Sequence, residues 1–135
     1  MRIRYQRERI SAAEFAEILL SSGLAQRRPV DDHPRLQRML DGAPLIITAR
    51  DAGTGRLVGI ARSLTDWAYA CYLSDLAVHE DWKGHGIGTT LIARTREAAG
   101  EDSMCLLVAS PDAEGFYRRI GMPPADRAFL YPRRR

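Results

Sequence analysis

The residues best suited to chemistry in this chain form a glycine-rich loop between an apolar strand and a helix. Glycines stand at the alternate positions 84, 86 and 88, after Lys83 and before the helical run that includes Leu91. Glycine lets the main chain approach a ligand closely. The first amides of a helix have no partner within it and carry the positive end of its dipole. The pattern predicts a phosphate-binding loop, with the Lys83 charge at its entrance.

Two common phosphate loops differ from this one in spacing. A P-loop needs Gly-x-x-x-x-Gly-Lys-Ser/Thr, and no Lys-Ser or Lys-Thr pair follows these glycines. A dinucleotide fingerprint needs Gly-x-Gly-x-x-Gly and an acid about 20 residues later. Here the glycines simply alternate, and residues 104–109 do not end in an acid. The spacing of the glycines therefore excludes both a P-loop and a dinucleotide-binding loop.

The loop Lys83-Gly-His-Gly86-Ile-Gly88 resembles the Arg/Gln-x-x-Gly-x-Gly/Ala motif of the GNAT superfamily of N-acetyltransferases, with lysine at the first position. The preceding Leu76-Ala-Val78 resembles the bulged strand on which that family holds the pantetheine arm. Residues 113–122 resemble its second signature: an alanine, then Phe-Tyr, then a glycine followed by a hydrophobic residue. The two signatures lie at the family's usual separation, and the order of elements agrees over nearly the whole chain.

The resemblance implies a co-substrate, acetyl-CoA, and no metal. Its pantetheine arm is expected in a V-shaped gap between two splayed parallel strands, residues 69–78 and 104–109. The loop amides would hold the pyrophosphate, and the backbone of the first strand would pair with pantetheine. The expected cofactor-binding residues are Leu76, Ala77, Val78, Lys83, Gly84, His85, Gly86, Ile87, Gly88, Thr89 and Phe116.

Acyl transfer to an amine requires an amine that has lost a proton, a stabilised carbonyl oxygen and a proton for the leaving thiolate. By the resemblance, Tyr117 is expected to protonate the thiolate, and the alternative is that this tyrosine belongs to the core. Asp75 is the candidate base, acting directly or through water. It could equally anchor a cationic substrate, cap a turn or pair with an arginine.

The family places the acceptor pocket near two segments of this chain, residues 23–34 and 62–67. Carboxylates at positions 31, 32 and 66 could attract an ammonium group, and neighbouring aromatic rings could stack on an apolar part of the substrate. This favours a basic small-molecule amine. The candidate substrate-binding residues are Asp32, Trp67 and Tyr72.

The predicted function is transfer of an acetyl group from acetyl-CoA to a primary amine by direct attack in a ternary complex. Two alternatives stay open. One is a non-catalytic module that binds acyl-CoA for regulation, and the other is an enzyme that acetylates protein N-termini or lysine side chains. Homodimers are frequent in the family, and composition does not reveal an interface here.

The bulk composition is that of one soluble domain, residues 1–135, with 45% apolar and 27% charged residues. The net charge of +3 equals the contribution of Arg133, Arg134 and Arg135 alone, so no nucleic-acid partner is expected. No apolar run approaches the roughly 20 residues of a membrane span, and the first residues lack a secretory apolar region. We therefore expect a cytoplasmic protein, with Cys71 and Cys105 as core thiols.

The hydrophobic pattern predicts an α+β fold. Residues 45–78 form an antiparallel meander, and residues 104–109 are an apolar run typical of a strand covered on both faces. Ser11 and Glu14 form a capping box at the start of a helix that Gly23 would end. Asp32, His33 and Pro34 would open a second, shorter helix, and residues 122–131 could add one or two short strands. With the resemblance, the expectation is a GNAT-like α/β/α sandwich. Its sheet is mostly antiparallel, with two splayed central parallel strands and about four helices.

Overall fold

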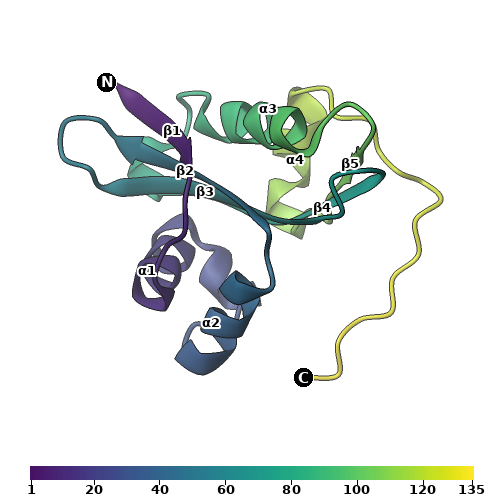
Figure 1. The fold of residues 1–135 in the computed structure, drawn as a ribbon, viewed down its shortest axis with the longest axis horizontal. Coiled ribbons are helices and arrows are strands. Elements are labelled where there is room, and N and C mark those ends of the chain that lie inside the picture. The colour runs from purple at the N-terminus through teal and green to yellow at the C-terminus, as the bar shows by residue number, and fades with distance from the viewer.

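A five-stranded sheet separates two layers of helices (Figure 1). The structure is a computed structural model that describes all residues, 1–135. The strand order is β1-β2-β3-β4-β5, antiparallel except for the parallel pair β4–β5, which confirms the predicted fold. No helix has the length and apolarity that crossing a membrane requires. The strands are β1 (Ile3–Arg7), β2 (Leu45–Asp51), β3 (Leu57–Thr65), β4 (Ala70–Val78) and β5 (Met104–Leu106); the α-helices are α1 (Ala12–Ser22), α2 (His33–Asp41), α3 (Ile87–Ala99) and α4 (Glu114–Arg119).

Each face of the sheet carries its own hydrophobic core. On one face, α1 and α2 bury Phe15 and Leu36 against Ile60 of β3. On the other face, α3 buries Ile87 and Leu91 among residues of β2, β3 and β4. The second contact is so close that a Cβ at Gly59 would lie 3.1 Å from the side chains of both Ile87 and Leu91. A larger residue at this position would therefore push α3 away from the sheet.

The ends of the first two helices follow the predicted signals, with one difference. Ser11 Oγ accepts a hydrogen bond from the Glu14 amide at 3.1 Å, and Gly23 ends α1 in the left-handed conformation (φ +86°). Asp32 caps α2 by accepting from the Arg35 amide at 3.1 Å. The predicted return bond from the Glu14 carboxylate is absent, because that carboxylate pairs with an arginine of β2 instead.

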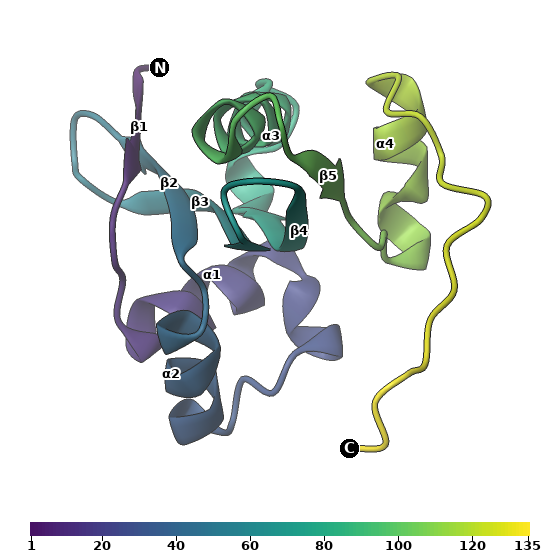
Figure 2. The same cartoon turned by 45° about the vertical axis from the view of Figure 1, so that its right-hand side comes forward.

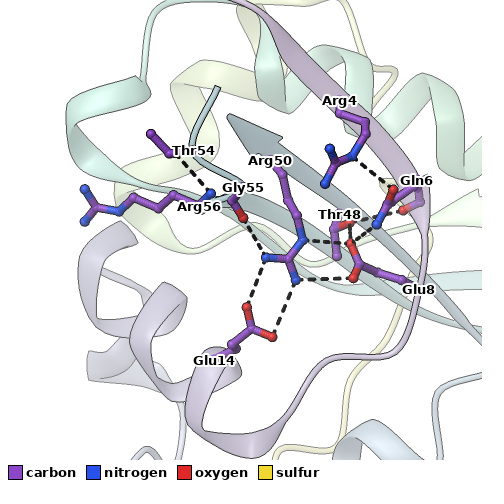
Figure 3. Close-up of polar contacts among 9 residues, drawn as sticks. All are labelled: Arg4, Gln6, Glu8, Glu14, Thr48, Arg50, Thr54, Gly55 and Arg56. Atoms are coloured by element: carbon purple, nitrogen blue, oxygen red, sulfur yellow. Dashed lines mark hydrogen bonds and ion pairs between the residues drawn. The ribbon is translucent and has the colours of Figure 1, made fainter. Parts of the chain in front are cut away.

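That arginine, Arg50, joins α1 to the sheet (Figure 3). Its Nε donates to Glu8 at 2.9 Å, and one Nη donates both to Glu14 at 3.1 Å and to the Gly55 carbonyl at 3.0 Å. Thr48 donates a further hydrogen bond to Glu8. Burial by itself would raise the pKa of Glu8, but the hydrogen bonds from Arg50, Thr48 and Gln6 outweigh it and hold that pKa below its ordinary value of 4.5.

We expect Arg50→Met to lower the free energy of unfolding by about 2 kcal/mol at pH 7, because it removes the guanidinium that pairs with both Glu8 and Glu14 and leaves Glu8 only the donors of Thr48 and Gln6. The Glu8 pKa is depressed in the folded state, so this contribution is present above the unfolded pKa and is lost as pH falls through the folded pKa. Urea unfolding from pH 7 to pH 3 measures both effects. Arg118→Met, which removes an exposed pair with Glu114, is the matched control and should change stability by less than about 0.5 kcal/mol. Equal losses in the two variants would contradict a joining role for Arg50.

Two predictions about the C-terminal third are wrong. The apolar run 104–109 yields a strand of only three residues, partly exposed, because β5 is the last strand of the sheet and pairs only with Ala70–Tyr72. Residues 122–135 form no strand. The consecutive prolines 123 and 124 lack the amides that a strand pairing needs. This tail instead runs down the side of the molecule from α4 toward the level of α2 (Figure 2).

The two cysteines face each other across the β4–β5 pairing. Cys71 is fully buried, as predicted, and Cys105 is half-buried. Burial, together with the neighbouring Cys71 thiol, raises the pKa of Cys105 to about 11. Cys105 is therefore a thiol rather than a thiolate at neutral pH.

Candidate active site

The glycine loop presents an uninterrupted row of free main-chain donors. The six amides from Gly84 to Thr89 donate to no acceptor in the chain, and helical bonding begins with the Thr90 amide, which donates to the Gly86 carbonyl at 3.0 Å. Residues 84–86 and Thr89 are exposed at the N-terminus of the 13-residue helix α3, whereas Ile87 and Gly88 between them are buried. Such a row, at the positive end of a helix dipole, is suited to a diphosphate.

The three positions of the loop require glycine for different structural reasons. Gly84 and Gly86 have φ of +83° and +78°, in the left-handed region, and no heavy atom lies within 4 Å of where their Cβ would be. Gly88 has ordinary helical geometry, but its Cβ would lie 3.1 Å from the Phe116 ring. The first two glycines therefore shape the loop, and the third lets α4 pack against the start of α3.

The side chains of the loop contribute less than its main chain. Lys83 Nζ donates to the Ser22 carbonyl at 3.0 Å, so its charge ties the loop to the end of α1. His85 is exposed, and Ile87 is buried in the core, which leaves only its amide for a ligand. The predicted phosphate contacts of this segment therefore depend on backbone geometry.

A β-bulge in β4 lies where β4 parts from β5. In the β3–β4 register, Arg62 pairs with Asp75 and Ser63 pairs with Leu73, so Ser74 is the extra residue. The β4–β5 pairing ends at Tyr72, two residues before Ser74. A bulge bends its strand and increases the local twist, which accounts for the divergence of the two strands. The resemblance indicated a bulged strand at residues 76–78, and the observed bulge lies slightly earlier.

A cavity of about 440 Å³ occupies the region between the diverging strands, the segment after α1, and the tail. Of the predicted site residues, Tyr72, Leu76 and Tyr117 line it. Asp32 instead caps α2, and the Trp67 ring lies outside the cavity with the Arg7 guanidinium 4.7 Å above it. A second cavity of about 230 Å³, beside Arg50, is lined by neither Tyr117 nor the glycine loop.

Asp75 is fully buried beneath this cavity and is shared by two arginines. Arg28 and Arg62 each donate from Nε to one of its carboxylate oxygens. The same two arginines hold the bulge: Arg28 donates to the Ser74 carbonyl at 2.9 Å, and Arg62 donates to the Ser74 hydroxyl at 3.0 Å. Of the roles left open for Asp75, the structure shows pairing with arginine, and the cluster fixes the shape of β4 next to the gap.

We expect Asp75→Asn to destabilise the protein by about 3 kcal/mol, because it leaves two largely buried guanidiniums without their shared carboxylate. Chemical unfolding at pH 7 measures the loss, and Asp112→Asn, at an exposed position whose side chain has no hydrogen-bond or ion-pair partner, is the control. A stable Asp75→Asn protein that lost only turnover would instead support Asp75 as the base.

Tyr117 lies on α4 at the wall of the cavity and is half-buried. Its ring meets that of Phe116 edge to face, with 5.1 Å between the centroids. Burial raises the pKa of the Tyr117 hydroxyl above its ordinary value of 10.0, so this group keeps its proton at neutral pH. A protonated hydroxyl at the gap is a suitable acid for a leaving thiolate.

The fold, the free amides at the start of α3 and the gap beside them define an acyltransferase-type domain. The acetyltransferase (GNAT) domain family matches residues 42–121, and the chain belongs to this family.

Relatives and solved structures agree with this membership. The chain is 36% identical over 96 residues to an uncharacterised N-acetyltransferase, ycf52, of Porphyra purpurea, covering 65% of this chain and 53% of that protein. It therefore spans about half the length of the curated relatives it matches. The structure of a GNAT-family acetyltransferase from Streptococcus pneumoniae superposes on this chain with a TM-score of 0.77 and 18% identity. The match covers 99% of this chain and 100% of the other. The structure of an aminoglycoside N-acetyltransferase in complex with CoA superposes with a TM-score of 0.71 and 15% identity. That match covers 98% of this chain and 95% of the other.

Proposed function

We propose that this chain transfers an acetyl group from acetyl-CoA to a primary amine of a small molecule by direct attack in a ternary complex. The observation that carries the proposal is the row of six free amides at the start of α3, next to a gap that ends at Tyr117. Family membership supports the reaction class.

In this proposal, acetyl-CoA follows the backbone of the protein. Its pyrophosphate accepts hydrogen bonds from the amides of residues 84–89. Its pantetheine arm lies along β4 beyond Tyr72, past Leu76 and Val78, where the strand has no β5 neighbour. The thioester then reaches the cavity near Tyr117. Support comes from the CoA complex of the aminoglycoside N-acetyltransferase, which shares the fold.

In this proposal only Tyr117 takes a direct part in the chemistry. The amine nitrogen attacks the thioester carbonyl carbon, the carbon–sulfur bond breaks, and Tyr117 gives its proton to the departing thiolate. Binding the two reactants together makes their encounter unimolecular. Asp75 acts as a positioning residue in this scheme, because two guanidiniums occupy its carboxylate and it lies below the cavity surface.

The test is to incubate the purified chain with acetyl-CoA and a panel of primary amines, then to follow free thiol and the acetylated product by mass spectrometry. Amine-dependent thiol release with a matching acetylated product is the expected result. Tight acetyl-CoA binding without transfer to any acceptor would point to a regulatory module. Transfer confined to peptide N-termini or lysines would point to a protein acetyltransferase.

A further inference from the structure

The cavity next to the gap is lined by arginines and by no acidic side chain. The five guanidiniums come from the segment after α1, from α2, from β3 and from the tail. No Asp, Glu or His lines the cavity. The arginines are Arg27, Arg28, Arg35, Arg62 and Arg133.

Three of these five arginines have no acidic partner. Arg28 and Arg62 share the buried Asp75, whereas Arg27, Arg35 and Arg133 form no ion pair. Arg35 donates from one Nη to the main-chain oxygen of Arg135, the last residue of the sequence, at 3.3 Å. The cavity is thus strongly positive, although the chain as a whole carries only +3.

We propose that the acceptor is a small amine that carries an anionic group, a carboxylate or a phosphate, near its amino group. This inference rests on the proposed function and names its substrate class. A guanidinium presents a planar fork of donors that matches carboxylate and phosphate oxygens in pairs. Arg27, whose guanidinium has no partner, and Arg35, which donates only to the last residue of the tail, are the residues that bind the anionic group.

The charge of the cavity runs opposite to the one expected from the sequence. The carboxylates that were candidates for attracting an ammonium group do not line it. Asp66 accepts hydrogen bonds from the amides of Ala68, Tyr69 and Ala70, and these bonds hold its pKa below the ordinary value. Asp32 caps α2. A dicationic acceptor would meet repulsion from every charged group on the cavity wall.

The same positive field helps the amine to react. Nearby like charges disfavour the ammonium form and lower the pKa of the amine. The acceptor then loses one proton to solvent before it attacks the carbonyl carbon, and a second proton as the amide bond forms. Tyr117 gives its proton to the CoA thiolate and regains one from solvent. The cavity therefore activates the amine without a carboxylate base.

Matched acceptor pairs test the proposal. The thiol-release assay compares β-alanine with its amide, O-phosphoethanolamine with ethanolamine, and putrescine as a dication. We expect kcat/KM for each anionic member to exceed that of its match without the anionic group at least tenfold, with putrescine lowest. Arg27→Gln and Arg35→Gln should each raise KM for the anionic acceptors about tenfold, the scale of a lost charge-assisted fork. Their KM for acetyl-CoA should not change.

Arg38→Gln is the matched control, since Arg38 is an exposed arginine on the same helix as Arg35 and lies outside the cavity. An equal or higher kcat/KM for amines that lack an anionic group, or for putrescine, would overturn the proposal. So would a rise in KM for acetyl-CoA in the Arg27 and Arg35 variants, which would assign these arginines to the CoA phosphates.

Absence of transfer to every amine would refute the proposed function instead, and the anion site then has its own readout. Thermal unfolding in the presence of CoA would show stabilisation by β-alanine or O-phosphoethanolamine that Arg27→Gln removes. No stabilisation by either compound would overturn the anion site as well.

Discussion

Gly86→Glu is expected to abolish CoA binding, with no heat of binding in a calorimetric titration that gives a clear isotherm for the unmodified chain. The new carboxylate would lie among the free amides of residues 84–89, where it would occupy donors and repel a diphosphate. No heavy atom lies within 4 Å of the Gly86 Cβ position, so the side chain would extend into the ligand space rather than into the protein.

The control for Gly86→Glu must separate the effect of the new carboxylate from the backbone strain that any side chain causes at this position. Gly86 has a φ of +78°, and any other residue there costs about 1–2 kcal/mol of stability. Gly86→Ala carries the same strain with neither bulk nor charge, and should have a similar unfolding midpoint while keeping measurable CoA affinity. Unchanged CoA affinity in Gly86→Glu would refute the assignment of this loop to the pyrophosphate.

Tyr117→Phe is expected to lower kcat by about 10²-fold, the lower range for a lost general acid, with little change in KM for acetyl-CoA. The variant removes one hydroxyl and keeps the ring that packs against Phe116, so folding should be preserved. Steady-state thiol release and thermal unfolding measure the two effects separately.

Tyr69→Phe is the matched control for Tyr117, because Tyr69 is an exposed tyrosine that does not line the cavity. It should leave kcat within about threefold, well short of the loss expected for a general acid. Because burial raises the Tyr117 pKa above 10.0, proton donation should persist to at least pH 9 in the unmodified chain. Full activity of Tyr117→Phe would assign this tyrosine to packing alone.

Much of the fold could be predicted because its signals are local. Ser11, Gly23 and Asp32 set helix ends through single hydrogen bonds or one backbone conformation, and these appear as expected. The meander of β2, β3 and β4 follows from short connections between apolar runs. The glycine loop likewise joins a strand to a helix directly.

The parts that could not be predicted depend on contacts between distant residues. The Glu14 carboxylate binds Arg50, 36 positions away, so the capping box alone does not determine its partner. The Arg28–Asp75–Arg62 cluster has one signal in the sequence: a buried strand position such as Asp75 needs a compensating charge. Register then places Arg62 opposite it. The positive charge of the cavity wall likewise comes from five arginines that the fold brings together from separate parts of the chain.

The sharing of Asp75 between Arg28 and Arg62 has a consequence for how this protein could diversify. One carboxylate holds a wall of the cavity and the bulge that parts β4 from β5, so substitutions at these three positions should be epistatic. A double-mutant cycle on Arg28 and Arg62 should show non-additive losses. A lineage that replaced one of these two arginines to change the acceptor would at the same time disturb β4, along which we propose that pantetheine lies. Changes of specificity are therefore easier at Arg27, which holds nothing else in place, and at Arg35, which contacts only the end of the tail.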